Sequence, residues 1–308
     1  MACLYEYMPS IHYLLWENMR RSCLALHLTA ALLLSSSVHL ATAAPAATAD
    51  AAASAATPLV IGESFTIDSQ ALKEQRHINV YVARAWDTPP DAPLPVLYMP
   101  DGGVAEDFLH VAGLLQVSVT NGTMRPFMLV GMQNTQRRRD LTGPTDSAED
   151  RKIAPVVGGS QAYRAFIRDE LMPEVKRRYR TTGETAIVGE SLAGLFVVET
   201  YLLEPQLFDH YLAFDPSLWW NQGALPLQAA DLLAKGKPGK RSLYLASSSE
   251  AGIAVEVQRL ADVLQKQAPP GLQWHVEKMP EESHGTIYHP AALKAFRSVF
   301  KPQEPARQ

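Results

Sequence analysis

Short apolar segments alternate with longer segments of helical periodicity along most of this 308-residue chain. This alternation restricts the fold more than any other feature, because alternating strands and helices pack as a mostly parallel sheet with helices on both faces. Two early segments, 65–67 and 78–83, are predicted strands that form an antiparallel pair. The other predicted strands are 95–99, 127–132, 185–188, 211–214, 242–246 and 273–278, and the predicted helices are 161–180, 192–203, 225–233, 254–265 and 290–300. The predicted fold class is therefore α/β, with Pro173 expected to kink the helix at 161–180.

The N-terminal region has the pattern of an exported protein. Arg20 and Arg21 precede an apolar run at 24–38, and small residues follow at 41–43. These are the charged, apolar and cleavage regions of a secretory signal peptide, which we predict at residues 1–43. The apolar run is shorter than the roughly 20 residues of a membrane span. An uncleaved N-terminal anchor is the alternative, and Met19 offers an alternative start of the chain.

Composition sets the remaining boundaries. Residues 44–57 are rich in Ala, with a few other small or polar residues, and predict a flexible tether. Residues 58–304 are then expected to form one folded domain. Both cysteines, Cys3 and Cys23, precede this domain, so no disulfide is expected to stabilise it, and a domain of this length buries enough apolar surface without one. The predicted location is periplasmic or secreted.

The charge balance favours no polyanionic partner. The chain has 28 Lys and Arg residues against 32 Asp and Glu residues, a net charge of −4. A balance of this kind gives no argument for binding nucleic acid or an anionic membrane surface. We expect no nucleic-acid partner and no stable membrane insertion after signal cleavage. The oligomeric state is left open.

The central motif is Gly189-Glu190-Ser191-Leu192-Ala193-Gly194, which lies between a predicted strand and a predicted helix. A nucleophile elbow needs this arrangement, since a sharp strand-to-helix turn lifts the serine hydroxyl above the sheet. Gly189 and Ala193 are the small residues that let the strand and the helix approach, although glycine is more usual than Ala193. The motif predicts Ser191 as a nucleophile. In the alternative interpretation, Ser191 only caps the helix.

His284 is the predicted general base. It lies after the last predicted strand and before the last predicted helix, the place that follows from the chain order of nucleophile, acid and histidine in such enzymes. His289 is the one rival and is expected instead to begin the final helix. A serine and a histidine so placed predict nucleophilic catalysis.

The acid partner is expected after the penultimate predicted strand, 242–246. Glu250 follows that strand and is the predicted acid. Glu256 and Asp262 are alternatives further along the predicted helix. A backbone carbonyl in place of a strong acid is a further alternative, because the acid's task is to orient the imidazole and to stabilise the imidazolium.

Two backbone N–H groups are expected to bind the oxyanion. One is that of Leu192, directly after the nucleophile. The other is that of Gly102, in the turn Asp101-Gly102-Gly103 after the strand 95–99, where glycine lets the backbone approach a substrate. An ordinary tight turn is the alternative interpretation of these glycines.

Five motifs follow one another along the chain: 97–103 (LYMPDGG), 133–142 (QNTQRRRDLT), 189–194 (GESLAG), 215–220 (DPSLWW) and 282–285 (ESHG). Together they resemble the esterase D-like family of α/β hydrolases, nearest the enterobactin and bacillibactin esterase branch. The resemblance covers about residues 60–300. Two positions depart from the family pattern: Asp215 stands where serine is expected, and Arg138 replaces a smaller residue.

The resemblance implies an α/β-hydrolase fold and a serine esterase without metal or organic cofactor. In the siderophore branch, the substrate is a cyclic or linear ester that carries catechol amides. The wider family also contains feruloyl and acetyl esterases and acyltransferases. The predicted partner is thus a small-molecule ester, cleaved through an acyl-enzyme. An exported acyltransferase is the second hypothesis, and a non-catalytic ligand-binding protein is the third.

Four further side chains are predicted to contact the substrate. Arg137 and Arg139 follow a strand end, where a guanidinium binds an anionic group in bidentate fashion. In the alternative, Arg139 pairs with Asp140 or another carboxylate to hold the loop. Trp219 and Trp220 also follow a strand and are predicted to line the acyl pocket, or else to pack behind the elbow as core.

Overall fold

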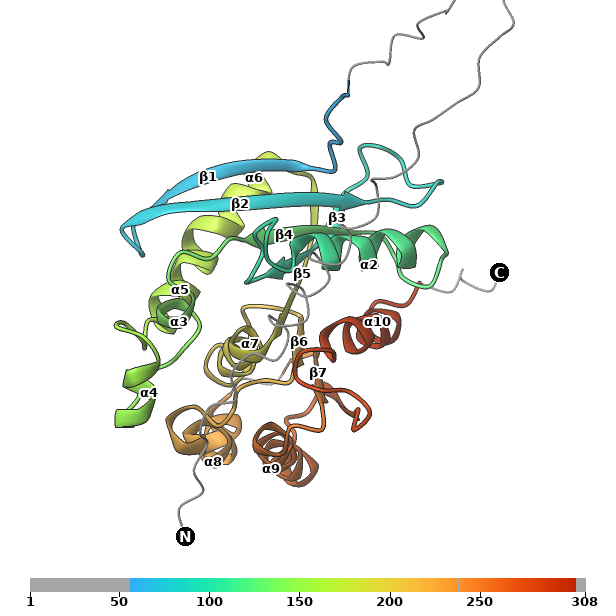
Figure 1. The fold of residues 1–308 in the computed structure, drawn as a ribbon. Helices are drawn as coiled ribbons and strands as arrows, with labels where there is room; N and C mark the ends of the chain where they lie inside the picture. The colour runs from blue at the N-terminus through green and yellow to red at the C-terminus, as the bar shows by residue number, and fades with distance from the viewer. Residues whose placement is uncertain (1–55, 237–238, 303–308) are drawn as a thin grey trace, which may run out of the picture. The chain divides into compact units, whose positions relative to one another are not determined.

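The computed structural model describes residues 56–236 and 239–302, and a compact unit begins at Pro58 (Figure 1). The predicted signal peptide at 1–43 lies outside the described residues, and so does nearly all of the predicted tether at 44–57. No helix among the residues described is long and apolar enough to cross a membrane.

The core of the unit is one eight-stranded sheet with the order β1-β2-β4-β3-β5-β6-β7-β8. β1 pairs antiparallel with β2, as expected for the two early strands, and β2 pairs antiparallel with β4. All other pairs are parallel. The predicted mostly parallel α/β sheet is confirmed. The strands are β1 (Glu63–Ser69), β2 (Glu74–Ala83), β3 (Leu94–Met99), β4 (Phe127–Met132), β5 (Thr181–Glu190), β6 (His210–Phe214), β7 (Arg241–Ser247) and β8 (Leu272–Lys278).

Helices cover both faces of this sheet (Figure 1). One face packs on α2 (Phe108–Thr120) and α10 (Tyr288–Val299). The other face packs on the remaining long helices and on the segment around α5. Because both faces are covered, β3 and β4 are buried along their whole length, as is usual for strands of a parallel sheet. The other helices are α3 (Arg137–Asp140), α4 (Ala148–Ile153), α5 (Ser160–Phe166), η1 (Ile167–Leu171), α6 (Met172–Arg178), α7 (Ser191–Leu203), α8 (Trp220–Lys235) and α9 (Ala251–Gln267).

The helix predicted at 161–180 is divided into three parts. α5 leads into the π-helical turn η1, and α6 follows with Pro173 at its start. Proline lacks an N–H and its ring clashes with the carbonyl of the preceding turn, so a continuous α-helix is unfavourable here. The wider π turn accommodates the proline without ending the helical segment.

The carboxyl ends of the parallel strands lie along one edge of the sheet, where ligand sites of such folds are built. Asp101 follows β3, Arg137 follows β4 and Ser191 follows β5. Asp215 follows β6 and His284 follows β8. The fold therefore brings together side chains that are widely separated in sequence.

Candidate active site

Ser191 is the first residue of α7 and directly follows the last residue of β5. Its φ of 60° lies in the left-handed region, which costs a non-glycine residue about 1–2 kcal/mol. The residue that flanks the helix as its N-cap is Glu190, and its side chain makes no capping hydrogen bond to α7. Ser191 is therefore not an N-cap. The structure places it on a strained strand-to-helix turn, the geometry of a nucleophile elbow.

The packing of this turn leaves no room for a side chain at Gly189. A Cβ at Gly189 would lie 2.6 Å from the carbonyl carbon of Ala193 and 2.7 Å from its Cβ. Both neighbours belong to the start of α7, so neither can move without displacing the helix that carries Ser191. The small residues on either side of the serine thus meet in space, as the motif predicts.

Gly189→Ala should destabilise the fold by about 1–3 kcal/mol or more, because the added methyl group overpacks a contact between two backbones. Gly113→Ala is the matched control. Gly113 lies inside α2, where a Cβ would meet no other described atom within 4 Å, so alanine there should stabilise the protein by about 0.5–1 kcal/mol. Chemical denaturation of both variants measures the difference, and equal stability of the two would contradict this account of the elbow.

Ser191 and His284 lie within hydrogen-bonding distance. The Nε2 atom of His284 is 3.1 Å from the Oγ atom of Ser191, and the Nδ1 atom is 2.9 Å from Oδ2 of Asp215. The rival His289 lies elsewhere, with its ring stacked on that of His110 at 5.0 Å between centroids. A hydroxyl, an imidazole and a carboxylate in one hydrogen-bonded chain can activate the hydroxyl as a nucleophile.

The predicted acid, Glu250, requires correction. Glu250 is the exposed N-cap residue of α9, and the carboxylate that accepts a hydrogen bond from His284 is that of Asp215. Asp215 follows β6, the strand next to β5, and is fully buried. The alternatives Glu256 and Asp262 make contacts within α9 instead, with Arg259 and Gln258 respectively.

One sequence signal pointed to Asp215. It was the departure from the family pattern, a carboxylate where serine is expected. The backbone N–H and the hydroxyl of Ser248 both donate to its carboxylate, each at 2.6 Å. Asp215 is therefore fixed in orientation by the end of β7, and it in turn fixes the ring of His284.

The charges in this chain of contacts favour an ionised acid. Burial alone would raise the pKa of Asp215, but the hydrogen bonds from His284 and Ser248 outweigh it, and the pKa is lowered. The hydrogen bond to Asp215 raises the pKa of His284 above its ordinary value, against an opposing effect of burial. The Nδ1 proton points to a carboxylate, which leaves Nε2 free to accept the proton of Ser191.

The two predicted oxyanion donors differ in whether their backbone N–H groups are available. Leu192 lies in the first turn of α7, where backbone N–H groups have no acceptor within the helix. The N–H of Gly102 is not free, because it donates to the carbonyl of Met132 at 3.0 Å. The turn after β3 continues the pairing with β4, which is why this N–H is used. A Cβ at Gly102 would meet the backbone of Gly131 at 2.3 Å, so this glycine is needed for the close approach of two chain segments.

The arginines after β4 divide between two tasks. Arg137 forms a bidentate ion pair with Asp101, at 2.7 and 2.8 Å. Arg139 pairs with Glu74 and with Asp140, the loop-holding alternative. Arg137 and Arg139 nevertheless line, with neighbouring residues, a surface hollow of about 350 Å³.

The two tryptophans are also divided. Trp220 is buried and its indole N–H donates to the carbonyl of Gly143 at 2.9 Å, so it is part of the core. Trp219 remains 38% exposed. Of the pair, only Trp219 presents its ring to solvent where a ligand can reach it.

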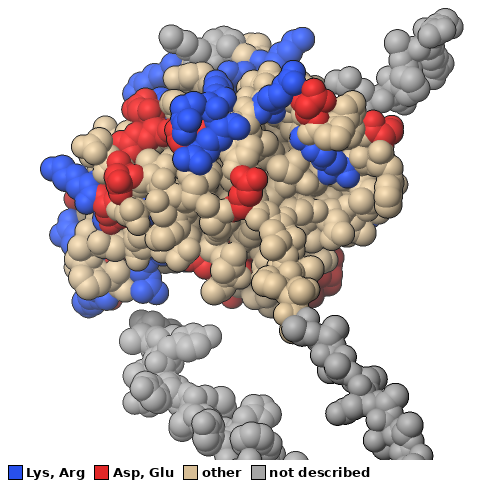
Figure 2. All heavy atoms as spheres, turned by 90° about the horizontal axis from the view of Figure 1, so that it is seen from above, with Lys and Arg blue, Asp and Glu red and all other residues tan. Residues whose placement is uncertain are grey.

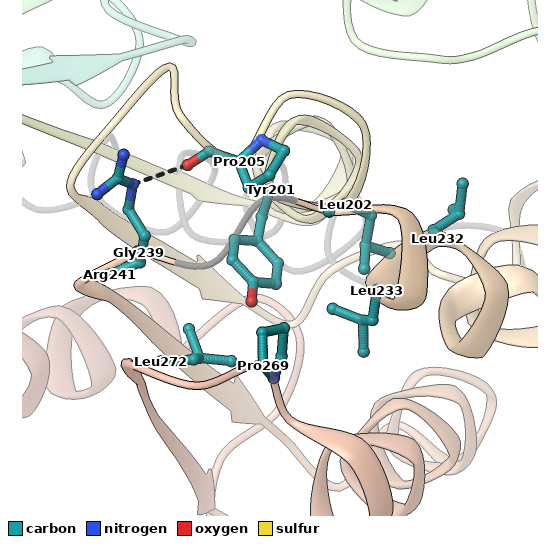
Figure 3. Close-up of a pocket in the computed structure, with 10 residues that line it drawn as sticks. Tyr201, Leu202, Pro205, Leu232, Leu233, Gly239, Arg241, Pro269 and Leu272 are labelled. Carbon is teal, nitrogen blue, oxygen red and sulfur yellow. Dashed lines mark hydrogen bonds between the residues drawn. The ribbon is translucent and has the colours of Figure 1, made fainter.

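A second, smaller cavity lies away from these residues (Figure 3). It is lined by Tyr201, Pro205, Arg241 and Leu272 among others. Arg241 and Leu272 begin β7 and β8, so the cavity lies at the opposite edge of the sheet from Ser191. Its volume is about 20 Å³, room for about one water molecule.

The sequence of this chain is similar to a protein family and to two named esterases. The model of a family described as "Putative esterase" matches residues 69–284. The ferri-bacillibactin esterase of Bacillus subtilis is 30% identical over 163 residues, covering 48% of this chain and 56% of that protein. The siderophore triacetylfusarinine C esterase of Aspergillus fumigatus is 33% identical over 147 residues, covering 42% of this chain and 46% of that protein. The chain thus spans about half the length of these relatives.

A solved structure resembles the chain over more of its length. It is an IroE-like serine hydrolase from Shewanella oneidensis, which superposes with a TM-score of 0.70 and 27% identity and covers 78% of this chain and 80% of that one. A likeness of this extent takes in most of the folded unit, so the two proteins share one architecture.

Proposed function

Because this chain belongs to the Putative esterase family, we propose that it is an exported serine esterase that hydrolyses siderophore esters through an acyl-enzyme. The single observation that carries the proposal is the hydrogen-bonded chain from Ser191 through His284 to Asp215. Such a chain performs acyl transfer to a serine hydroxyl.

The reaction follows from the geometry. Ser191 Oγ attacks the ester carbonyl while His284 Nε2 takes its proton, and the carbonyl oxygen becomes negative. His284 then gives that proton to the leaving alcohol as the ester C–O bond breaks. Water then attacks the acyl carbon while the same nitrogen takes one of its protons. The bond from the acyl carbon to Ser191 Oγ breaks, and His284 returns the proton to Oγ, which releases the acid and restores Ser191. Asp215 stays ionised throughout and stabilises the imidazolium.

Two observations support a siderophore ester as the substrate. The relatives above are named as esterases of ferri-bacillibactin and of triacetylfusarinine C. Of the three arginines that line the hollow, Arg138 is exposed and forms no ion pair within the described residues, and catecholates are anionic when they hold iron.

A panel of esters tests this proposal. Aryl acetate to butyrate, a feruloyl ester and a tri-catechol trilactone are assayed with untreated protein and with protein whose Ser191 is blocked by a fluorophosphonate. We expect the trilactone to show the highest kcat/KM and the blocked protein to show none. Hydrolysis equal to that of the blocked protein for every ester would exclude the function. Feruloyl ester as the best substrate, or transfer to an added alcohol, would move the chain to another branch of the family.

Export to the periplasm or the medium is part of the same proposal, and the basic, apolar and small-residue pattern of residues 20–43 supports it. Mass spectrometry of the protein recovered from those fractions should find a chain that starts near residue 44. A mass that includes residues 1–43 would instead support an anchor.

On the face seen in Figure 2, Lys and Arg side chains are interspersed with Asp and Glu, without a large area of one sign.

A further inference from the structure

Glu190 places a second carboxylate at the catalytic histidine. It is the last residue of β5, directly before Ser191. Its Oε1 atom lies 3.3 Å from Nδ1 of His284, the same nitrogen that Asp215 contacts at 2.9 Å. Only 17% of the Glu190 side chain is exposed, and within the described part of the chain this oxygen has no hydrogen-bond partner.

The two carboxylates cannot have the same role. Nδ1 carries one hydrogen, and Asp215 is both nearer to it and held by Ser248. Asp215 therefore accepts the hydrogen bond that fixes the tautomer. Glu190 acts on the ring through its charge, at a distance where an opposite charge has a large effect on the pKa of an ionisable group.

Glu190 also changes charge in the pH range in which a histidine titrates. Burial raises the pKa of Glu190 to about 7, while nearby positive groups oppose the shift and nearby carboxylates add to it. The ionisable groups that face Glu190 come from five segments and are His284, Arg137, Asp215, Asp101 and Tyr288. The charges of Glu190 and His284 are therefore coupled.

We propose that Glu190 is a positioning residue whose ionised carboxylate stabilises the imidazolium of His284 and holds that ring together with Asp215. The proposal rests on the proposed function and adds a second acid to it. When Ser191 bonds to the ester carbon, its proton moves to Nε2 of His284. The group of two carboxylates and one ring then passes from a net charge of −2 to −1, and each carboxylate lowers the energy of the charged ring.

Glu190→Gln tests this inference, because glutamine keeps the shape of the side chain and removes its charge. The pKa of His284 is measured by NMR in protein labelled at histidine, with His284→Gln used to assign the signal. Losing a negative charge beside Nδ1 disfavours the imidazolium, so the pKa of His284 should fall by about one unit. This readout needs no turnover and is therefore independent of whether the substrate has been identified.

Glu250→Gln is the matched control. Glu250 also raises the pKa of His284 by its charge, but it is exposed, and the hydrogen bond from Nδ1 goes to Asp215 instead. Solvent and salt screen such a charge, so this variant should move the pKa of His284 by less than about 0.2 units. Equal shifts in the two variants, or none in Glu190→Gln, would overturn the inference.

Kinetics supply a second readout. The acid limb of kcat/KM reports the pKa of the free enzyme's base, so in Glu190→Gln it should move to lower pH by the same amount. A purely structural role would change stability or KM and leave this limb in place. An unmoved limb in an enzyme that still depends on Ser191 would contradict the inference and leave the esterase assignment intact.

Asp215→Ala keeps the inference testable should Glu190→Gln fail to fold, because alanine removes the first carboxylate without adding an amide that could donate to Nδ1. Burial lowers the pKa of His284, so a ring without any carboxylate should titrate below the ordinary value of about 6.5. With Glu190 still present, we expect the pKa of His284 in Asp215→Ala to stay at or above that value. A value well below it would show that Glu190 does not act on the ring.

Discussion

Ser191→Ala should lower kcat for an activated aryl ester by about 10⁶-fold, the largest effect expected of any single substitution in this chain. Alanine removes the hydroxyl that becomes part of the acyl-enzyme, and among the described residues the hydroxyl that Nε2 of His284 contacts is that of Ser191. The activity that remains is expected to come from binding and from the oxyanion donors. Steady-state rates at saturating substrate measure it.

Ser217→Ala is the matched control for that loss. The Oγ atom of Ser217 lies 3.5 Å from that of Ser191, and the side chain is buried beside it, but the imidazole pairs with Ser191 instead. We expect Ser217→Ala to keep most of the activity. Retention of more than about a tenth of the wild-type rate by Ser191→Ala would remove Ser191 from the role of nucleophile.

Asp215→Asn is expected to lower kcat by about 10³–10⁴-fold while the fold is kept. The asparagine amide can donate where the carboxylate accepted, so it favours the imidazole tautomer with the proton on Nε2, which cannot receive the proton of Ser191. The second carboxylate, Glu190, preserves part of the function, so Glu190→Gln should cost more in the Asp215→Asn background than in the wild type.

Glu250→Gln tests whether the acid partner of His284 is Asp215 or Glu250, the acid expected after β7. An exposed side chain at the start of α9 should have little effect on kcat when its charge is removed. Rates and thermal unfolding of both variants are measured together, so that a loss of folded protein is not counted as a loss of chemistry. An inactive Glu250→Gln beside an active Asp215→Asn would return the role of acid to Glu250.

The residues that local sequence could assign were Ser191 and His284. The elbow is a contiguous motif whose small residues, strand and helix are all adjacent in the sequence, and the structure brings its serine to His284 at 3.1 Å. The acid depends instead on which strand lies beside β5. Chain order alone does not give that neighbour. It predicts Glu250, after the penultimate strand, whereas β6 carries Asp215 to the ring.

The oxyanion turn illustrates the same difference. Glycines after a strand predict a free backbone, but the N–H of Gly102 is taken by Met132 of the neighbouring strand. That contact follows from the pairing of β3 with β4, which the glycines themselves do not encode. Sequence could locate the turn and could not say which of its N–H groups remains available.

Helix α2 was not predicted, although its buried residues recur at helical spacing from Phe108 to Val119. Gly113 lies at its centre, and Val111, Val117 and Val119 are β-branched. These residues have low intrinsic helix propensity, so the local signal was weak. Packing of this segment against β2, β4 and α10 stabilises the helix in the folded protein.

The left-handed backbone at Ser191 has a consequence for the history of the sequence. Glycine adopts a φ of 60° without penalty, so Ser191→Gly should melt at a higher temperature than the wild type and than Ser191→Ala, and a gain in stability then accompanies the loss of the nucleophile. A lineage released from the need to cleave esters would be expected to drift to glycine here. Retention of serine in descendants of this chain would therefore record continued selection for the hydroxyl against the preference of the backbone.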